Sequence, residues 1–353
     1  MSAVTQLRNF MKEKGLDAVL SLDELNQRYL TGFAFTDGFV FVTQASAYLV
    51  TDGRYIELAG KSAYPDFTCL VPEDRHAFLA GVMAKEGIRT VGFEGNFVPY
   101  AVYHKYCEDF PDVAFEDIGA AVETIRQIKN PEEIALMQKA QDITDAAFSH
   151  ILTVLNPDMT EIEVAAELEY TMRKLGADGL AFDTIAVSGD ASALPHGVPR
   201  PVKLKRGFLT MDFGAKYHGY CSDMTRTVVI GKADDDIRKV YNTVLKAQLA
   251  AEAYLKEGAD CGEADKVARD IIEPEYPGAF SHSLGHSVGL FIHETPGLNR
   301  RAFGRILRAG EIVTIEPGIY LFGKYGCRIE DMAQIVPGGL SIFTHSTKEL
   351  IEI

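Results

Sequence analysis

A chain of 353 residues is longer than one ordinary domain and can bury two sizeable cores, so two domains are expected. Its hydrophobic fraction of 47% and charged fraction of 24% are typical of a folded globular protein and exclude a largely disordered chain. The formal net charge of −15 argues against binding to nucleic acid or to an anionic membrane surface, because both need clustered Lys and Arg.

The sequence also carries signals about the cellular compartment. It contains no apolar run of about 18 residues, and residues 1–15 have no uninterrupted apolar core, so we expect neither a membrane span nor a signal peptide. The five cysteines are scattered and form no C-x-x-C pair, which favours a reducing compartment over a disulfide framework. The sequence therefore predicts a cytoplasmic protein.

Residues 1–125 alternate short helical patterns with strand-like runs, which predicts a small α/β domain. The expected strands are residues 17–22, 39–43, 47–51, 67–71 and 91–95. Polar residues in this region show no spacing that indicates a chemical site. The stretch TDGRY at 51–55 is most simply a turn that leads into a helix.

A second domain is expected to run from residue 126 to residue 353 and to begin with two long helices. Capping boxes, in which an N-cap residue and a Glu three positions later bond each other's backbone N–H groups, predict where these helices start. They pair Asn130 with Glu133, and Thr160 with Glu163. The second helix is expected to stop at Gly176.

The order helix, helix, strand-like stretch, hairpin then occurs twice. In the first pass the strand-like stretch is 182–188 and the hairpin is 211–227. The second pass consists of residues 235–255, 262–273, 280–293 and 311–336. The two passes share no evident sequence identity, so the repeat is one of element order, and it predicts two similar halves that face each other.

The first hairpin, MDFGAKYHGYCSDMTRT, contains two aspartates. A turn at Tyr217 and His218 would place Asp212 directly opposite Asp223, with Cβ atoms about 5 Å apart. Two ionised carboxylates at that distance repel by roughly 3 kcal/mol at an effective dielectric near 20. A shared proton, a basic partner or a cation must therefore offset the repulsion.

The second hairpin, TIEPGIYLFGKYGCRIEDM, poses the same problem. Glu316 and Glu330 lie symmetrically about Gly323, so these two acids also face each other. Four carboxylates on two matching hairpins would form a strongly negative, partly buried pocket. Two divalent cations could neutralise that pocket charge for charge.

A nitrogen ligand is expected from the segment between the hairpins, which offers His282, His286 and His293. His286 is favoured because Gly285 and Gly289 let the backbone approach a crowded centre. Oxygen ligands with one imidazole suit Mn²⁺ or a similar ion better than a thiolate-type zinc site. A thiolate from Cys221, on the strand face of Asp223, is a minor alternative.

Each of these features also has an ordinary structural interpretation. An Asp beside a hairpin turn usually bonds the turn backbone, and a Glu before Pro-Gly is often a simple loop acid. A His in a strand with glycines is usually structural. These separate explanations would all have to hold at once, whereas one metal site explains both acid pairs, the histidine segment and the repeated element order.

Five motifs together resemble the pita-bread-fold metallopeptidases, the family of methionine aminopeptidase, aminopeptidase P, prolidase and creatinase. In the family's order and spacing they are SALPHG (192–197), MDFGAKYHGYCSDMTRT (211–227), GHSVGLFIHE (285–294), IEPGIY (315–320) and GCRIEDM (326–332). The resemblance implies an α+β pita-bread catalytic domain with pseudo-twofold halves over 126–353. Residues 1–125 resemble the smaller α/β creatinase-like N-terminal domain of the prolidase and aminopeptidase P branch.

The resemblance implies a two-metal centre and a role for each residue around it. Its five ligands would be Asp212, Asp223, His286, Glu316 and Glu330, with Asp223 and Glu330 bridging. Glu316 would also act as general base toward a metal-bridging water. His196 and His293 would line the substrate side and hold the scissile carbonyl and the leaving nitrogen. The side chains expected to orient the ligands are Tyr220, Thr225 and Arg328.

The implied activity is that of an Xaa-Pro aminopeptidase or an Xaa-Pro dipeptidase (prolidase), which hydrolyses the bond between an N-terminal residue and proline. The expected substrates are small peptides with proline second, and the expected cofactors are two divalent ions, Mn²⁺ with Co²⁺, Zn²⁺ or Fe²⁺ as alternatives. The family leads us to expect a homodimer, with neither nucleic acid nor membrane as a partner.

The same scaffold also supports other activities. A methionine-preferring aminopeptidase is the first alternative. A non-catalytic peptide-binding relative is disfavoured because the five ligand positions are complete, and metal-free creatinase-like hydrolysis is disfavoured for the same reason. The sequence leaves dipeptides and longer peptides both open as substrates.

Overall fold

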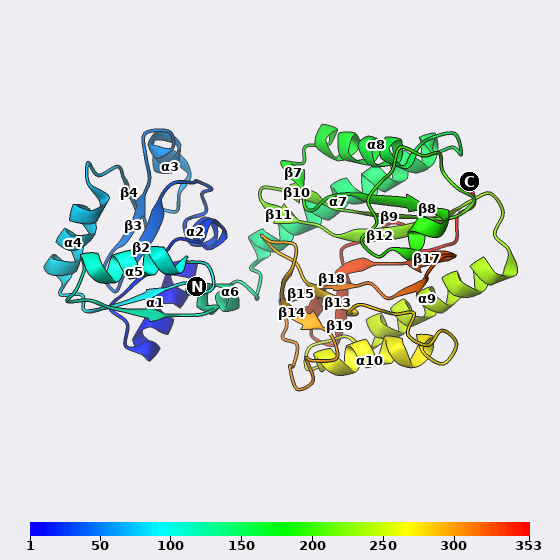
Figure 1. The fold of residues 1–353 in the computed structure, drawn as a ribbon. Helices are drawn as coiled ribbons and strands as arrows, with labels where there is room; N and C mark the ends of the chain where they lie inside the picture. The colour runs from blue at the N-terminus through cyan, green and yellow to red at the C-terminus, as the bar shows by residue number, and fades with distance from the viewer. The chain divides into compact units, whose positions relative to one another are not determined.

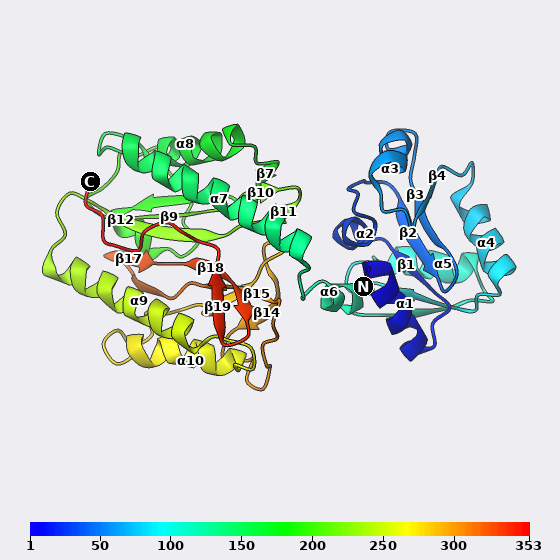
Figure 2. The same cartoon turned by 180° about the vertical axis from the view of Figure 1, so that it is seen from behind.

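The computed structural model describes all residues from 1 to 353, and the chain divides into two compact units, Met1–Arg126 and Gln127–Ile353. Figures 1 and 2 show the fold of each unit from opposite sides. No helix combines the length and the apolar character that crossing a lipid bilayer requires.

The first unit is built on a six-stranded sheet with strand order β4-β3-β2-β1-β5-β6. Its strands are β1 (Ala18–Ser21), β2 (Phe39–Thr43), β3 (Ala47–Val50), β4 (Thr68–Leu70), β5 (Thr90–Phe93) and β6 (Ala114–Asp117). Its helices are α1 (Ala3–Lys14), α2 (Glu24–Thr31), α3 (Ile56–Ser62), α4 (Arg75–Glu86), α5 (Tyr100–Asp109) and α6 (Ala121–Ile125). The five predicted strands are confirmed, but β6 was missed because its sequence AFED is short, acidic and mostly exposed.

The four long helices of the second unit form two pairs. They are α7 (Pro131–Val154), α8 (Glu161–Lys174), α9 (Asp235–Tyr254) and α10 (Cys261–Ile272). Both predicted capping boxes are confirmed, at the first turns of α7 and α8. Helix α8 ends at Lys174, and Gly176 follows with a positive φ of 103°, close to the predicted stop.

The strands of the second unit follow the predicted repeat. The first half holds β7 (Gly179–Leu180), β8 (Ile185–Ser188), the short 3₁₀ helix η1 (Gly189–Ala193), β9 (Gly207–Phe213), β10 (Ala215–Tyr217), β11 (Tyr220–Cys221) and β12 (Met224–Ile230). The second half holds β13 (Gly285–Ser287), β14 (Glu294–Leu298), β15 (Ile312–Ile315), β16 (Gly318–Leu321), β17 (Tyr325–Arg328), β18 (Asp331–Val336) and β19 (Gly339–Ile342). Each half contributes a three-stranded antiparallel sheet, β12-β9-β8 or β15-β18-β19.

Each half of the second unit has its own apolar core. One core packs α7 and α8 against β8, β9 and β12, through residues such as Leu168 and Met211. The other packs α9 and α10 against β15 and β18, through residues such as Val244 and Val313. In Figure 1 the strands of this unit lie between α7 and α8 on one side and α9 and α10 on the other. The helices thus leave the central strands free to carry polar side chains where the halves meet.

The register of the first hairpin differs from the predicted one. Asp212 in β9 pairs with Thr225 in β12, so the prediction that Asp212 lies directly opposite Asp223 is wrong by two residues. Asp223 immediately precedes β12 and lies diagonally across from Asp212. Because side chains alternate with a period of two, a shift of two residues keeps both acids on the same face of the sheet. The diagonal placement also lengthens the separation that direct opposition would impose.

The turn of this hairpin explains the error. Tyr217 pairs with Tyr220, so the two-residue loop consists of His218 and Gly219, both with positive φ, 46° and 80°. A two-residue hairpin loop of this type needs positive φ at both central positions. Gly adopts that conformation readily, whereas a Tyr at the predicted turn position would be strained.

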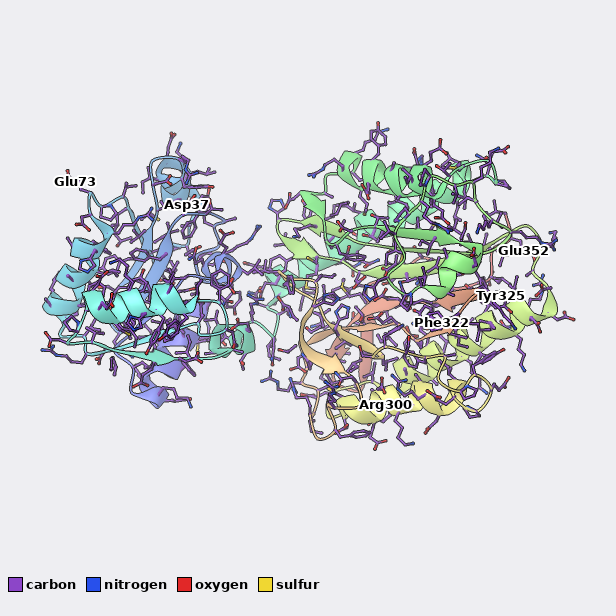
Figure 3. All side chains as sticks on the ribbon, viewed as in Figure 1. Asp37, Glu73, Arg300, Phe322, Tyr325 and Glu352 are labelled. Carbon is purple, nitrogen blue, oxygen red and sulfur yellow. The ribbon has the colours of Figure 1, made fainter.

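The predicted register of the second hairpin is confirmed. The pairs β15–β18 and β16–β17 share one register, which places Glu316 opposite Glu330 in the gaps between these strands. The tip is a three-residue loop centred on Gly323, whose φ is 76°. Figure 3 labels Phe322 and Tyr325 at this tip.

The turn geometry predicts that substitutions at the two loop positions of the first hairpin differ in their effect on stability. Gly219→Ala should lower the free energy of unfolding by about 1 kcal/mol, because a Cβ disfavours the left-handed conformation. His218→Asn should leave it within about 0.5 kcal/mol, because Asn tolerates that conformation. Urea unfolding followed by circular dichroism measures both values, and an unchanged midpoint for Gly219→Ala would contradict the assigned turn.

Candidate metal centre

A cavity of about 610 Å³ lies in the second unit and is lined by residues of both halves. All five predicted ligands reach it: Asp212, Asp223, His286, Glu316 and Glu330. Three further predicted residues also line it: His196, His293 and Arg328. Residues more than 100 positions apart in the sequence therefore converge on one space.

The local structure explains why these side chains point inward together. Asp212 lies near the end of β9, and Asp223 occupies the short break between β11 and β12. Glu316 and Glu330 occupy the matching breaks between β15 and β16 and between β17 and β18. His286 is the middle residue of β13. Strand breaks leave room for a carboxylate that a continuous apolar ladder would have excluded.

Three of these side chains come close enough to share one ion. A ligand atom from each of Asp223, His286 and Glu330 lies within 4.8 Å of the others. The Nε2 atom of His286 is 3.5 Å from Asp223 Oδ2 and 3.4 Å from Glu316 Oε1. This spacing suits a cation placed between the groups better than direct hydrogen bonds, which are shorter.

Two carboxylates each hold one oxygen in a hydrogen bond and leave the other buried without a protein partner. Asp212 Oδ2 accepts from Arg328 Nη2 at 2.6 Å, and Glu330 Oε2 accepts from the Thr225 hydroxyl at 2.7 Å. Asp212 Oδ1 and Glu330 Oε1 are buried and accept no hydrogen bond. Buried polar atoms are rarely left unpaired, so these free oxygens fit the ligands of a bound cation.

The acids destabilise one another's charged forms. Burial, together with the neighbouring carboxylates, raises the pKa of Asp223 and of Glu330 well above their usual range. Burial is also the main cause that raises the pKa of Glu316 to about 8. Divalent cations in this space would reverse these shifts, because a nearby positive charge favours the ionised carboxylate.

His286 presents a lone pair to the same space. Its Nδ1 atom is 3.1 Å from the backbone carbonyl of Ser287, which can only accept, so Nδ1 carries the hydrogen. Burial lowers the pKa of His286 to about 4, which keeps the ring neutral. A neutral imidazole fixed through its other nitrogen is the form that binds metals.

Arg328 and Thr225 form a chain of hydrogen bonds behind the acids. The guanidinium of Arg328 donates through Nη2 to Asp212, and through Nε to the Thr225 hydroxyl at 2.9 Å. The Thr225 hydroxyl in turn donates a hydrogen bond to Glu330, so one arginine positions candidate ligands on both hairpins. Tyr220 is placed differently from the other predicted orienting residues, because its hydroxyl donates to Glu133 of α7 at 2.8 Å and it does not line the cavity.

The sequence prediction missed two supporting residues. Thr314 accepts from the backbone N–H of His286 at 3.0 Å and donates to Glu316 Oε1 at 3.2 Å. Tyr320 accepts from Arg328 Nη1 at 2.6 Å. Both lie an even number of positions from Glu316 in the same hairpin, and that parity was the signal that they share its face.

Three further histidines line the cavity: His196, His282 and His293. His293 is exposed, with its ring centroid 4.5 Å from that of His286, and His196 is also exposed. His282, which the sequence offered as a nitrogen ligand but ranked below His286, lines the cavity and has Nε2 2.8 Å from the Tyr320 hydroxyl. Cys221 is buried with its thiol 3.8 Å from the Leu290 carbonyl and is not part of the cavity lining.

Two family models match the chain. Residues 135–337 match metallopeptidase family M24, and residues 4–128 match the Creatinase/Prolidase N-terminal domain. A protein named Xaa-Pro dipeptidase from Pyrococcus horikoshii is 36% identical over 352 residues, covering 99% of this chain and 98% of the relative.

Solved structures agree with these matches. The structure of an Xaa-Pro dipeptidase from Bacillus anthracis is 41% identical, has a TM-score of 0.95 and covers 99% of both chains. That of an X-Pro aminopeptidase from Thermotoga maritima is 35% identical, has a TM-score of 0.91 and covers 96% of this chain and 98% of the other. The predicted resemblance and the predicted α+β pita-bread architecture are confirmed. By both sequence and fold, the chain belongs to metallopeptidase family M24.

Proposed function

We propose that this metallopeptidase hydrolyses the bond between an N-terminal residue and a following proline in small peptides. The observation that supports it most strongly is the convergence of four carboxylates and a neutral imidazole in one cavity, with two buried carboxylate oxygens that no protein group bonds. The choice of an Xaa-Pro bond rests on the names of the similar proteins, which include both dipeptidases and an aminopeptidase.

In this proposal five side chains hold two divalent cations, with Mn²⁺ as the expected ion and Co²⁺, Zn²⁺ or Fe²⁺ as alternatives. They are Asp212, Asp223, His286, Glu316 and Glu330, of which Asp223 and Glu330 would be shared by both ions. When bound, the two ions would supply a water of lowered pKa and an electrophile for the peptide carbonyl.

The chain's own groups would then handle protons and orientation. Glu316, steadied by the Thr314 hydroxyl, would accept a proton from the attacking water. His196 and His293 at the cavity opening would donate hydrogen bonds to the carbonyl oxygen and help protonate the leaving nitrogen. An Xaa-Pro amide has no N–H to grip, so the substrate must be held through these other groups.

We also propose that residues 126–353 form the catalytic domain and residues 1–125 a separate domain, that the enzyme is a homodimer, and that it acts in the cytoplasm. The domain assignment is supported by the cavity lining, all of which falls between residues 182 and 330. The predicted reducing compartment agrees with five free cysteines, three of which are buried.

Substrate length provides a direct test. Met-Pro, Met-Pro-Ala-Ala and Met-Ala-Ala-Ala would be incubated with the protein plus Mn²⁺ or Co²⁺, with a chelated sample as the control, and the released residues measured by chromatography. Metal-dependent cleavage of Met-Pro alone would identify a dipeptidase, and cleavage of Met-Pro-Ala-Ala an aminopeptidase. Preferred cleavage of Met-Ala-Ala-Ala would replace the proposal with a methionine-preferring enzyme.

Removing a shared ligand should abolish activity and metal binding together. Asp223→Ala and Glu330→Ala each delete one carboxylate of the cluster, so calorimetric titration should detect no tight Mn²⁺ binding and Met-Pro hydrolysis should disappear. Asp142→Ala removes an exposed acid of α7 and serves as the control that keeps both properties. Full activity in either cluster variant would contradict the shared-ligand assignment.

His293→Ala should separate catalysis from metal binding. The imidazole of His293 lies at the opening rather than among the clustered carboxylates, so its loss should lower kcat by about 10²- to 10⁴-fold while Mn²⁺ affinity stays close to wild type. Steady-state kinetics and calorimetry on one preparation decide the point. A parallel loss of metal binding would instead make His293 a ligand.

A further inference from the structure

Arg226 is an almost fully buried arginine in β12, next to the site but outside the cavity lining. All five of its N–H donors are used. They reach the backbone carbonyls of Thr225 (2.9 Å), Glu330 (2.5 Å), Ser346 (2.8 Å) and Thr347 (3.0 Å), and Asp331 Oδ1 (2.6 Å). A guanidinium with five directed donors cannot shift without breaking several of these bonds at once.

The partner carboxylate is held just as firmly. Asp331 has a side chain only 1% exposed, and its second oxygen accepts from Lys348 Nζ at 2.7 Å and from Gln248 at 3.1 Å. Lys348 also contacts Glu252 of α9. Residues 346–348 of the C-terminal segment therefore bond both members of the Arg226–Asp331 pair, and none of these residues lines the cavity.

This ion pair joins the two halves at the metal centre. Arg226 belongs to the strand that begins just after Asp223, and Asp331 follows Glu330 directly. Between them, the backbone N–H of Glu330 donates to the Thr225 carbonyl at 3.1 Å. Arg226 bonds both the Thr225 and the Glu330 carbonyl, so it links the chain segments that directly follow Asp223 and include Glu330.

Stability alone does not account for a charged residue here. Arg226 and Asp331 are each only 1% exposed, so both charges are removed from water. Taking an ion pair out of water has a large desolvation penalty, and proteins in which both partners are replaced by well-packed apolar residues are often as stable. What an apolar side chain cannot reproduce is the directed bonding to carbonyls of both halves.

We propose that Arg226 is a positioning residue, whose guanidinium sets the spacing between Asp223 and Glu330 across the metal centre and thereby the affinity for the metal ions. The proposal rests on the proposed function, because it requires Asp223 and Glu330 to bind a common ion. Arg226 would act only through these two ligands, by way of the backbone of Thr225 and Glu330.

Mn²⁺ binding to metal-stripped protein tests the proposal without any turnover. Arg226→Met leaves buried Asp331 with Lys348 as its remaining cation. The matched control is Arg305→Met, which removes one arginine from buried Glu311 and leaves Arg308 with it. Both variants thus lose one arginine from a buried two-cation acid, but Arg226 bonds the Glu330 carbonyl, whereas Arg305 bonds none of the candidate ligands.

Calorimetry should show Mn²⁺ affinity weakened by about 10- to 100-fold in Arg226→Met. Affinity should stay within about twofold of wild type in Arg305→Met, whose site is separate from the ligands. The thermal unfolding temperature of each metal-free variant reports the purely structural damage. Equal Mn²⁺ affinity in wild type and Arg226→Met would overturn the positioning role, while absence of binding in wild type would overturn the proposed function and this inference with it.

Arg226→Lys provides a second measurement in case Arg226→Met does not fold. Lysine keeps the positive charge opposite Asp331 but offers three donors instead of five. Weaker Mn²⁺ binding at an unchanged unfolding temperature would support positioning by directed bonds. Wild-type affinity in Arg226→Lys would overturn it, because charge alone would then be sufficient.

Discussion

The mutual repulsion of buried carboxylates is the constraint on which the rest of the catalytic unit depends. Burial first, and neighbouring carboxylates second, raise the pKa values of Asp223, Glu316 and Glu330, and the His286 lone pair faces the same space. Such a cluster can persist only if hydrogen-bond donors hold the carboxylates in place and cations neutralise their charge. Arg328 and the Thr225 hydroxyl are such donors, and they leave one oxygen of Asp212 and one of Glu330 free to bind a cation.

The two-half architecture follows from this requirement. Each half has a main apolar core under its own pair of helices, but Phe208 and Val229 of the first half extend into the core of the second. Near the cavity, polar links add to these apolar contacts: the bonds of Thr225 to Glu330, and the five-donor guanidinium of Arg226. Metal ions bound between the halves would add to these links, because a ligand that binds only the folded state stabilises it.

Most of the correct structural predictions came from patterns among residues close together in the sequence. The capping boxes at Asn130 and Thr160 depend on residues three positions apart, and both formed. The second hairpin was predicted in the correct register because its acids lie symmetrically about Gly323, the centre of its turn. The first hairpin was predicted two residues out of register, because the choice of Tyr217 overlooked the positive φ that Gly219 supplies.

The contacts that hold the candidate ligands could not be predicted in the same way. Arg226 and Glu330 lie 104 positions apart, and Arg226 and Thr347 lie 121 apart, so no spacing in the sequence brings them together. A carboxylate pair on one hairpin stands out because it creates a local conflict that something must resolve. The groups that offset this repulsion are distant in the sequence and are brought close by folding, as Arg328 is to Asp212. Spacing can thus reveal where charge must be balanced, whereas the balancing residues are defined only once both halves are packed.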